Sequence, residues 1–336
     1  MNIIVPMAGR GSRLRPHTLT VPKPLVPVGG KPIVHRLVED IAAVLDQKID
    51  NIAFIIGDFG TEIENELLAV AEKLGAKGSI HFQNEPLGTA HAVLCAKEHL
   101  QGPTVVAFAD TLFKADFKID PATDGILWVK QIEDPSAFGV VKMNESGEII
   151  DFVEKPQTFV SDLAMIGIYY FREGEKLRTE LEYLIDNNII KGGEYQLPDG
   201  LRRLTEAGYK FKPGEVSEWL DCGNKEVTVF TNQRVLEYDL EKNVPQERKA
   251  LNSTNSVIIE PCFIGKNVQL ENAIVGPHVS LGNGSIVKNS IVKNTIVQNN
   301  SKLINVVVAD SMIGSNAAFE KTPNDISIGD YTTIKG

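Results

Sequence analysis

The chain has 336 residues, of which 43% are hydrophobic, and this length exceeds what one hydrophobic core usually organises, so two structural units are expected. Lysines and arginines number 34 against 44 aspartates and glutamates, and the formal net charge of −10 argues against electrostatic binding to nucleic acid or to an anionic membrane. Cys95, Cys222 and Cys262 lack the spacing of a disulfide framework or zinc site, and no signal peptide or membrane-spanning run is evident, so a cytoplasmic protein is expected.

The first third of the chain alternates short β-branched runs with helical patterns. Strands are predicted at residues 2–5, 52–56, 80–82 and 104–108, and helices at about 32–45, 61–74 and 88–100. This order predicts a Rossmann-like α/β domain with a mostly parallel sheet flanked by helices. Ligands bind beyond the carboxyl ends of the strands in such sheets, so the loop after Val5 and Asp110, which follows the fourth strand, are predicted to face one crevice.

The middle of the chain continues with strand-like runs separated by turn residues. These runs, at residues 126–129, 138–143, 149–153 and 165–171, predict a second sheet region in the same domain, so that the domain's sheet structure is mixed. Helical patterns follow near residues 176–185, 197–207 and 225–240. Residues 241–255 are charged and polar, contain Pro245 and lack periodicity, which predicts a linker between a domain at 1–240 and a domain at 256–336.

An internal repeat marks the last part of the chain. Residues 285–289 (SIVKN), 290–294 (SIVKN) and 295–299 (TIVQN) follow one another, and aliphatic-glycine pairs such as Ile264-Gly265 recur around them. Glycine at such spacing suits short strands that each end in a tight corner. The segment resembles hexapeptide-repeat proteins, which implies a short left-handed parallel β-helix of about four coils.

A loop with two glycines and several cations follows the first predicted strand. Residues 9–14 (GRGSRL) let backbone N–H groups approach an oxyanion, and guanidinium groups add charge-assisted hydrogen bonds, so they predict a phosphate cradle. Taken alone, the loop could equally be a solvated basic turn. The first 38 residues contain no acidic side chain but include six cations, namely Arg10, Arg13, Arg15, Lys23, Lys31 and Arg36.

Residues 8–16 (AGRGSRLRP), Thr18, residues 22–27 (PKPLVP) and Lys31-Pro32 together resemble the opening of the sugar-1-phosphate nucleotidyltransferase family. The resemblance, which extends in chain order over residues 1–240, implies that Arg13 holds the leaving pyrophosphate and that Lys23 holds the phosphates at the reacting centre. It assigns nucleotide binding to Ala8, Gly9, Gly11 and Ser12. The loop is one residue shorter than the doubled-glycine form of many thymidylyltransferases and is nearer to that of UTP-using enzymes.

Further matches imply sites for the base and the sugar phosphate. In residues 83–90 (QNEPLGTA), the Gln83 amide would pair with a base edge and Gly88 would let the base approach the backbone. In Glu154-Lys155-Pro156, Lys155 would face the phosphate and Glu154 would accept sugar hydroxyls. The resemblance adds three contacts to the sugar, at Gly139, Gly167 and Glu194.

Two aspartates match the metal-binding positions of the family. Asp110 and Asp221 stand after predicted strands far apart in the sequence, although their neighbours, Ala109 and Cys222, differ from the usual glycine and threonine. Two carboxylates suit Mg²⁺, which prefers oxygen ligands and shares its coordination shell with substrate phosphates. The six histidines show no metal-ligand spacing, so they are expected to be structural or exposed.

The family reaction is attack by a sugar-1-phosphate oxygen on the α-phosphorus of a nucleoside triphosphate, with pyrophosphate as the leaving group. The short repeat tail and the segment PLGTA favour dTTP with glucose-1-phosphate, and UTP- or GTP-dependent enzymes (UDP-glucose or GDP-mannose pyrophosphorylase) are the alternatives. Two alternatives belong to another class, a non-catalytic regulatory subunit and a bifunctional enzyme with an acyltransferase tail. In that tail His278 is the only histidine available as a base. A homo-oligomer assembled through or with the help of the β-helix is expected.

Overall fold

The protein is described from a computed structural model, which covers residues 1–9, 11–45, 47–115, 119–120, 122–245, 248 and 250–333. Arg10 of the predicted phosphate loop, three residues of the predicted linker and the last three of the predicted β-helix lie outside these ranges. The chain forms two compact units, Met1–Val26 with Lys31–Thr228, and Pro27–Gly30 with Val229–Gly336. No helix within the described ranges combines the length and the apolar character needed to cross a membrane.

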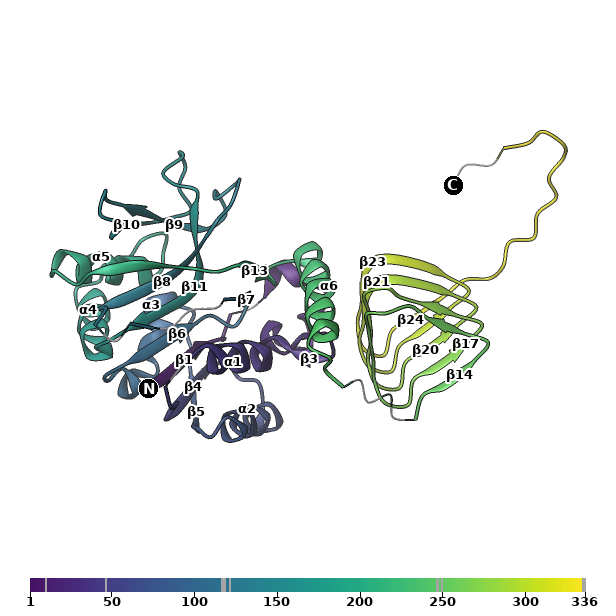
Figure 1. Ribbon diagram of the computed structural model, residues 1–336, viewed down its shortest axis with the longest axis horizontal. Coiled ribbons are helices and arrows are strands. Elements are labelled where there is room, and N and C mark those ends of the chain that lie inside the picture. The colour runs from purple at the N-terminus through teal and green to yellow at the C-terminus, as the bar shows by residue number, and fades with distance from the viewer. Residues whose placement is uncertain are drawn as a thin grey trace. The chain divides into compact units, whose positions relative to one another are not determined.

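The first unit is an α/β structure whose elements largely follow the predicted order (Figure 1). Its strands are β1 (Asn2–Pro6), β3 (Lys31–Pro32), β4 (Asn51–Ile56), β5 (Lys77–Phe82), β6 (Thr104–Ala107), β7 (Thr111–Lys114), β8 (Gly125–Gln131), β9 (Gly139–Met143), β10 (Ile149–Glu154), β11 (Leu163–Phe171), β12 (Phe211–Glu215) and β13 (Glu218–Asp221). Its helices are α1 (Ile33–Val44), α2 (Thr61–Lys73), α3 (Thr89–Leu94), α4 (Gly174–Asp186), α5 (Leu197–Glu206), the first residues of α6 (Lys225–Glu241), and the 3₁₀ helices η1 (Ser12–Leu14), η2 (Lys23–Leu25) and η3 (Lys97–His99).

One mixed sheet of nine strands organises this unit, in the order β5-β4-β1-β6-β11-β8-β12-β10-β9. The first four strands are parallel, and β11 is antiparallel to both β6 and β8. The predictions of a parallel sheet at the start of the chain and of a mixed sheet in this domain are therefore confirmed, but the prediction that the later strands form a second region is wrong. The reason is β11, whose residues Tyr169–Phe171 pair with β6 on one side and with β8 on the other, so the later strands extend the same sheet.

Both faces of the sheet are buried, as its continuous apolar strands require. Ile4 and Ile55 belong to the core that the sheet shares with Val93 of α3, Leu181 of α4 and Leu201 of α5. The alternate residues of β1, among them Ile3, are also fully buried. The predicted helix at 88–100 is shorter, because α3 ends at Leu94 and the chain tightens into η3.

The second unit contains β2 (Pro27–Val28), α6 from Val229 onward and a series of short strands. These are β14 (Asn252–Thr254), β15 (Val257–Ile258), β16 (Cys262–Ile264), β17 (Gln269–Glu271), β18 (Ile274–Val275), β19 (Val279–Leu281), β20 (Ile286–Lys288), β21 (Ile291–Val297), β22 (Lys302–Ile304), β23 (Val307–Ile313) and β24 (Ala318–Glu320). The pairings among β14 to β24 that the structure describes are parallel.

The short strands stack as successive coils, consistent with a β-helix (Figure 1). Val257 pairs with Ile274, Ile274 with Ile291 and Ile291 with Val307, so each coil advances by 17, 17 and then 16 residues. Aliphatic side chains from every coil point inward and form one core, for example Leu270, Val287 and Leu303. The coils are shorter than three hexapeptides because five-residue repeats replace six-residue ones in the middle of the segment.

Asparagines form one corner of the stack. Asn255, Asn272, Asn289 and Asn305 all have positive φ, between 46° and 57°. The first three side-chain amides each donate to the carboxamide of the next asparagine, over 2.8 to 3.1 Å, and Asn305 donates to Lys321 O. Asparagine tolerates the left-handed conformation better than most residues, and the ladder satisfies its polar side chain.

The boundary between the units lies inside α6, between Thr228 and Val229, rather than at the predicted 240/241 position. Polar residues of α6 explain the difference. Asn232 is fully buried, and its Oδ1 accepts hydrogen bonds from Ser280 Oγ over 2.7 Å and from Gly29 N over 2.8 Å. The predicted linker also contains β14, which pairs with β17 as part of the first coil.

Candidate active site

A pocket of about 330 Å³ lies beyond the carboxyl ends of the parallel strands in the first unit. The loop after β1 and Asp110, which follows β6, both line it, so the predicted crevice is present. Ten of its lining residues are predicted site residues, namely Ala8, Gly9, Gly11, Ser12, Arg13, Lys23, Gln83, Gly88, Asp110 and Glu194. Parallel strand order thus brings together side chains that are far apart in the sequence.

The loop after β1 is held in place by a left-handed glycine. Gly11 has a φ of +58° and precedes η1, and its carbonyl oxygen accepts a hydrogen bond from Thr18 Oγ1 over 2.7 Å. A Cβ atom on Gly11 would lie 2.8 Å from Lys23 Cβ and 3.2 Å from Thr18 Cγ2. The loop therefore packs directly on Lys23, which only glycine permits.

Lys23 and Asp110 form an ion pair in the pocket. Lys23 is held by η2 between two prolines, its side chain is 8% exposed, and its Nζ lies 2.9 Å from Asp110 Oδ2. Asp110 remains 44% exposed on its other side. The pair presents a fixed positive charge and an accessible carboxylate to the same space.

Asp221 lies beside this pair. Strands β13 and β7 are antiparallel with Asp221 opposite Thr111, and the next backbone N–H, from Cys222, donates to Asp110 O over 3.0 Å. Burial, followed by the charge of Asp110, raises the pKa of Asp221, while Lys23 and Arg13 oppose this effect. Asp110 is therefore close enough to disfavour the charged form of Asp221.

This arrangement fits a hard divalent cation. Carboxylate oxygens that repel one another and lie next to a pocket are the donor set that Mg²⁺ takes in phosphate-binding sites. Arg13 lies on the same side, since a Cβ on Gly223 would be 2.8 Å from Asp221 Oδ2 and 3.4 Å from Arg13 Nη2. Asp110 and Asp221 are the residues that would hold such an ion.

The segment after β5 lines another side of the pocket. Gln83 Nε2 donates to Gly88 O over 3.1 Å and lies 3.2 Å from His91 Nδ1. Gly88 has a φ of +112°, and a Cβ there would lie 2.5 Å from Tyr195 O. The chain's own packing therefore requires glycine at this position. From the sequence, glycine was expected here for a different reason, namely the approach of a base to the backbone.

A second pocket, of about 490 Å³, contains the predicted sugar-phosphate residues Glu154 and Lys155. Glu194 lines both pockets, so they adjoin at this side chain. Lys155 has a φ of +42°, and its Nζ lies 3.8 Å from Glu154 Oε1. Burial raises the pKa of Glu154, with Lys155 acting against it.

The two other predicted glycines, Gly139 and Gly167, are not among the residues that line either pocket. A Cβ on Gly139 would be 2.8 Å from Glu154 Oε2, and one on Gly167, whose φ is +85°, would be 3.5 Å from Phe108 Cβ. Both are therefore placed to position pocket residues.

Sequence reasoning missed a charged group in the second pocket. Lys191 Nζ and Arg202 Nη1 lie 2.5 Å and 2.7 Å from Asp199 Oδ1. Asp199 is 6% exposed, and its Oδ2 has no hydrogen-bond partner among the described residues. The sole sequence signal was the turn Gly192-Gly193 beside Lys191, whereas Arg202 looked like an ordinary helical surface residue.

The sequence of the chain matches a family model and several known proteins. A family model described as nucleotidyl transferase matches residues 2–237. A glucose-1-phosphate thymidylyltransferase of Streptomyces griseus is 29% identical, with 99% of this chain and 98% of that protein covered. A bifunctional protein GlmU of Methanococcus aeolicus is 30% identical over 82% of this chain, which spans 60% of that protein's length.

Solved structures share the fold of the first part of the chain. A UDP-glucose pyrophosphorylase complexed with UDP-glucose aligns with a TM-score of 0.55 at 24% identity, covering 70% of this chain and 98% of that one. A nucleoside-diphosphate-sugar pyrophosphorylase from Vibrio cholerae aligns with a TM-score of 0.58 at 22% identity, covering 69% and 99%.

Proposed function

Because the chain belongs to the nucleotidyl transferase family, we propose that it transfers a nucleotidyl group from a nucleoside triphosphate to a sugar-1-phosphate and releases pyrophosphate. The observation that carries this proposal is a pocket lined by Arg13, Lys23 and Asp110, with the Asp221 carboxyl within electrostatic reach of all three, next to a second, cation-lined pocket at Glu194. The first pocket offers phosphate and metal ligands, and the second offers carboxylates and lysines suited to a sugar phosphate.

In the proposed reaction, a phosphate oxygen of the sugar-1-phosphate forms a bond to the α-phosphorus, and the bond from that phosphorus to the pyrophosphate oxygen breaks. The nucleophile is already an anion, so alignment and charge neutralisation do most of the catalysis. Lys23 would bind the phosphates at the reacting centre, Arg13 the departing pyrophosphate, and Lys155 the sugar phosphate. Mg²⁺, when held by Asp110 and Asp221, would supply further neutralisation of phosphate charge.

The loop Ala8, Gly9, Gly11 and Ser12 would bind the nucleotide phosphates, and Gln83 with Gly88 would contact the base. Glu154 and Glu194 would accept sugar hydroxyls, behind which Gly139 and Gly167 position the backbone. For the pair of substrates we propose dTTP and glucose-1-phosphate, supported by the similarity of nearly the whole chain to the Streptomyces griseus enzyme. Substrates of this kind are cytoplasmic metabolites, which supports a cytoplasmic location.

One screen tests both the reaction and its substrates. Pyrophosphate release is measured with dTTP, UTP, GTP, ATP and CTP, each against the 1-phosphates of glucose, mannose, galactose and glucosamine, with Mg²⁺. The highest kcat/KM is expected with dTTP and glucose-1-phosphate. Release with UTP or GTP instead would overturn the choice of base alone, and no release with any pair would overturn the reaction.

The second unit is proposed to be a left-handed β-helix that promotes assembly of identical chains. One ladder of this unit exposes aligned apolar residues, Val257 at 55%, Ile274 at 40%, Ile291 at 43% and Val307 at 77%. A flat row of aliphatic side chains on a sheet favours burial against another such row. We propose that residues 1–240 act as the catalytic domain and residues 256–336 as the β-helix, with residues 241–255 connecting them and contributing β14 to the first coil.

A further inference from the structure

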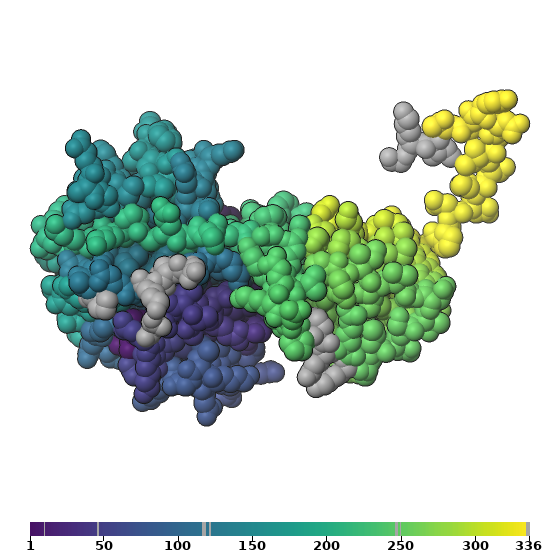
Figure 2. Space-filling model, viewed as in Figure 1, coloured from purple at the N-terminus to yellow at the C-terminus, as the bar shows by residue number. Residues whose placement is uncertain are grey.

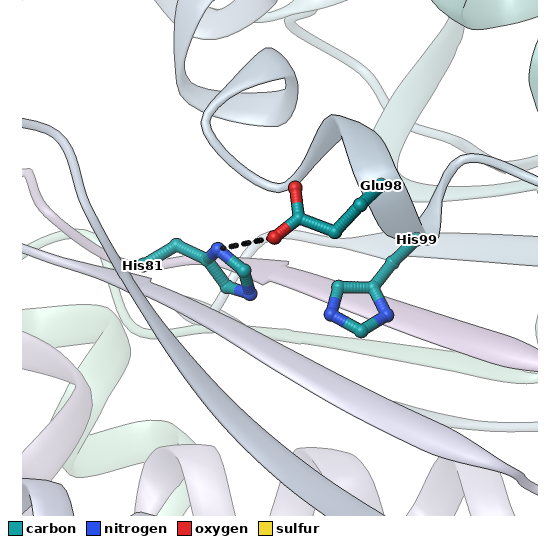
Figure 3. A group of neighbouring side chains, drawn as sticks. All are labelled: His81, Glu98 and His99. Atoms are coloured by element: carbon teal, nitrogen blue, oxygen red, sulfur yellow. Dashed lines mark ion pairs between the residues drawn. The ribbon is translucent and has the colours of Figure 1, made fainter.

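His81, Glu98 and His99 gather at the edge of the nine-stranded sheet, and none of them lines either active-site pocket. His81 projects from the edge strand β5, and the other two side chains come from η3 (Figure 3). One possible ligand atom from each residue lies within 4.8 Å of those of the others. Within the part of the chain that the structure describes, no other three histidine, cysteine or carboxylate side chains converge in this way.

Ser79 and Glu98 fix the orientation of the two imidazole rings, and an ion would replace Ser79 Oγ at one of them. Ser79 Oγ lies 3.0 Å from His81 Nε2 and 3.0 Å from His99 Nε2, and His81 Nδ1 lies 3.5 Å from Glu98 Oε1. A single hydroxyl can donate to one ring and accept from the other.

We propose that His81, Glu98 and His99 bind a divalent transition-metal ion, for which Zn²⁺ is the best match. Two imidazole nitrogens and one carboxylate oxygen form a usual three-ligand zinc set, with water completing the tetrahedron. Mg²⁺ prefers oxygen ligands, so this site differs in chemistry from Asp110 and Asp221. The ligand atoms would close to about 3.3 Å from one another, the edge of a tetrahedron with bonds of about 2.0 Å.

A bound ion would tie β5 to η3. Strand β5 leads directly into Gln83, and α3, which precedes η3, begins after Gly88. The ion would therefore brace both ends of the segment that contacts the base, a consequence that rests on the proposed function. Binding itself does not rest on it and is measured without substrate.

The test is a titration of the intact protein with Co²⁺, which reports imidazole coordination by its visible absorption, in excess Mg²⁺ to occupy oxygen-ligand sites. One equivalent of Co²⁺ is expected to bind, and Zn²⁺ is expected to displace it. His99→Ala and His81→Ala are expected to weaken binding at least about tenfold. Glu98→Gln, at a side chain that is 60% exposed, is expected to weaken binding without disturbing the fold.

His278→Ala, in the second unit, is the matched control and should bind Co²⁺ like the unmodified chain. Equal affinity in the unmodified chain and in all three cluster variants would overturn the site, as would a spectrum without imidazole coordination. Circular dichroism shows whether the histidine variants fold, and if they do not, Glu98→Gln decides. Pyrophosphate release is measured on the same samples. This measurement distinguishes a failure of the metal site from a failure of the proposed function.

The chain beyond β24 supports a second, independent inference, because it repeats the pattern of the preceding coils. An aliphatic residue, a polar or glycine pair and a residue with positive φ recur at Ile264–Asn267, Leu281–Gly284, Val297–Asn300, Ile313–Asn316 and again at Ile328–Tyr331. The last residue of each run has a φ of 57°, 68°, 56°, 57° and, at Tyr331, 62°. The same corner is thus encoded once more after the last strand.

The last coil is also less well covered than the others. Phe319 is 40% exposed, whereas its equivalents Leu270, Val287 and Leu303 are at most 2% exposed. The apolar residues that follow are exposed too, Ile326 at 64% and Ile328 at 49%, and Figure 2 shows this tail in yellow as a narrow, extended segment. From Ile313 to Ile328 is 15 residues, close to the 16 between Val297 and Ile313, so the tail has the length of one coil.

We infer that residues 322–333 fold back as the start of a further coil on β23 of their own chain. Ile328 would then follow Ile313 in the inward row and shield the end of the core at β23. Asp330 would take the position of Lys266, Asn283, Asn299 and Ser315, which lie at the polar corner of the earlier coils.

Hydrogen exchange of the β23 amides tests this coil. Ile328→Asp is expected to speed exchange at residues 307–313 at least about tenfold, since a charge would have to enter the core row. Asp330→Ala, at the exposed corner position, is the matched control and should leave exchange unchanged. Equal exchange in the unmodified chain and the Ile328 variant would overturn the inference, and so would protection that rises with protein concentration, which would mean pairing with a second copy.

Discussion

At the scale of single residues, Lys23 carries the clearest catalytic prediction. Its buried ammonium is fixed 2.9 Å from Asp110 and points into the pocket, so its loss removes a preorganised charge. Lys23→Ala is expected to lower kcat for pyrophosphate release by about 10²- to 10³-fold. Lys31→Ala is the control, because Lys31 is 42% exposed and pairs with Glu39. A folded Lys23 variant that keeps a near-normal rate would contradict the assignment.

Asp221 carries a prediction about stability and pH. Its pKa is raised above the usual value near 3.8, so the folded state favours the protonated carboxyl and loses stability as the pH rises through that raised value. Asp221→Asn is therefore expected to raise the unfolding midpoint at pH 7 without Mg²⁺, by roughly 2–4 °C, while abolishing activity.

The gain from Asp221→Asn should shrink as the pH falls and the wild-type carboxyl becomes protonated. Differential scanning calorimetry at pH 7 and near pH 4 measures both midpoints. A variant less stable than the wild type at pH 7 would show that Asp221 is held by interactions stronger than its repulsion with Asp110.

At the scale of elements, the loop after β1 is the part whose conformation can be tested most directly. Gly11→Ala places a side chain at a φ of +58° and 2.8 Å from Lys23 Cβ, so it should cost about 1–2 kcal/mol of stability and displace Lys23. Gly9→Ala is the matched control for stability, since no described heavy atom lies within 4 Å of its Cβ position. Urea unfolding should show a lower stability for the Gly11 variant than for the Gly9 variant, and equal stability would contradict the packing.

The asparagine corner of the coils offers a similar pair. Asn289 has a φ of +46° and bonds to the asparagines of the coils on both sides. Asn289→Ala should destabilise the second unit by about 1–2 kcal/mol, and Asn289→Gly by less because glycine adopts this φ freely. Thermal unfolding measures both, and a glycine variant as unstable as the alanine one would assign the effect to the lost ladder instead.

The strands and helices were largely predictable, because their apolar periodicity is local. Strand β12 was missed because its Pro213 and Gly214 are strand breakers, and yet it pairs in parallel with β8. The joining of two predicted sheets through β11 is a long-range pairing that no local pattern encodes. Within the site, the convergence of the β1 loop with Asp110 followed from strand order, whereas Asp199 with its two cations, and the contact of His81 with His99, depend on packing between distant elements.

At the scale of the whole molecule, the exposed ladder of the second unit predicts assembly. Ile291→Lys places a charge in the middle of the aligned row formed with Ile274 and Val307, and should shift the protein from oligomer to monomer. Lys302→Ala, on the separate strand β22, should leave the mass unchanged. Light scattering coupled to size-exclusion chromatography measures the mass of each protein in solution. A monomeric unmodified chain would refute assembly.

The contact between Gly88 and Tyr195 has a consequence for how substrate preference can change. Leu87 O accepts from Tyr195 N over 2.8 Å and Tyr195 O accepts from Ala90 N over 3.0 Å, so the proposed base-contacting segment is bonded on both sides to the segment that carries Glu194. A change in one of these segments should therefore alter the position of the other. Replacing one segment by that of a relative should disturb its hydrogen bonds to the other segment, so selectivity for nucleotide and for sugar should evolve together.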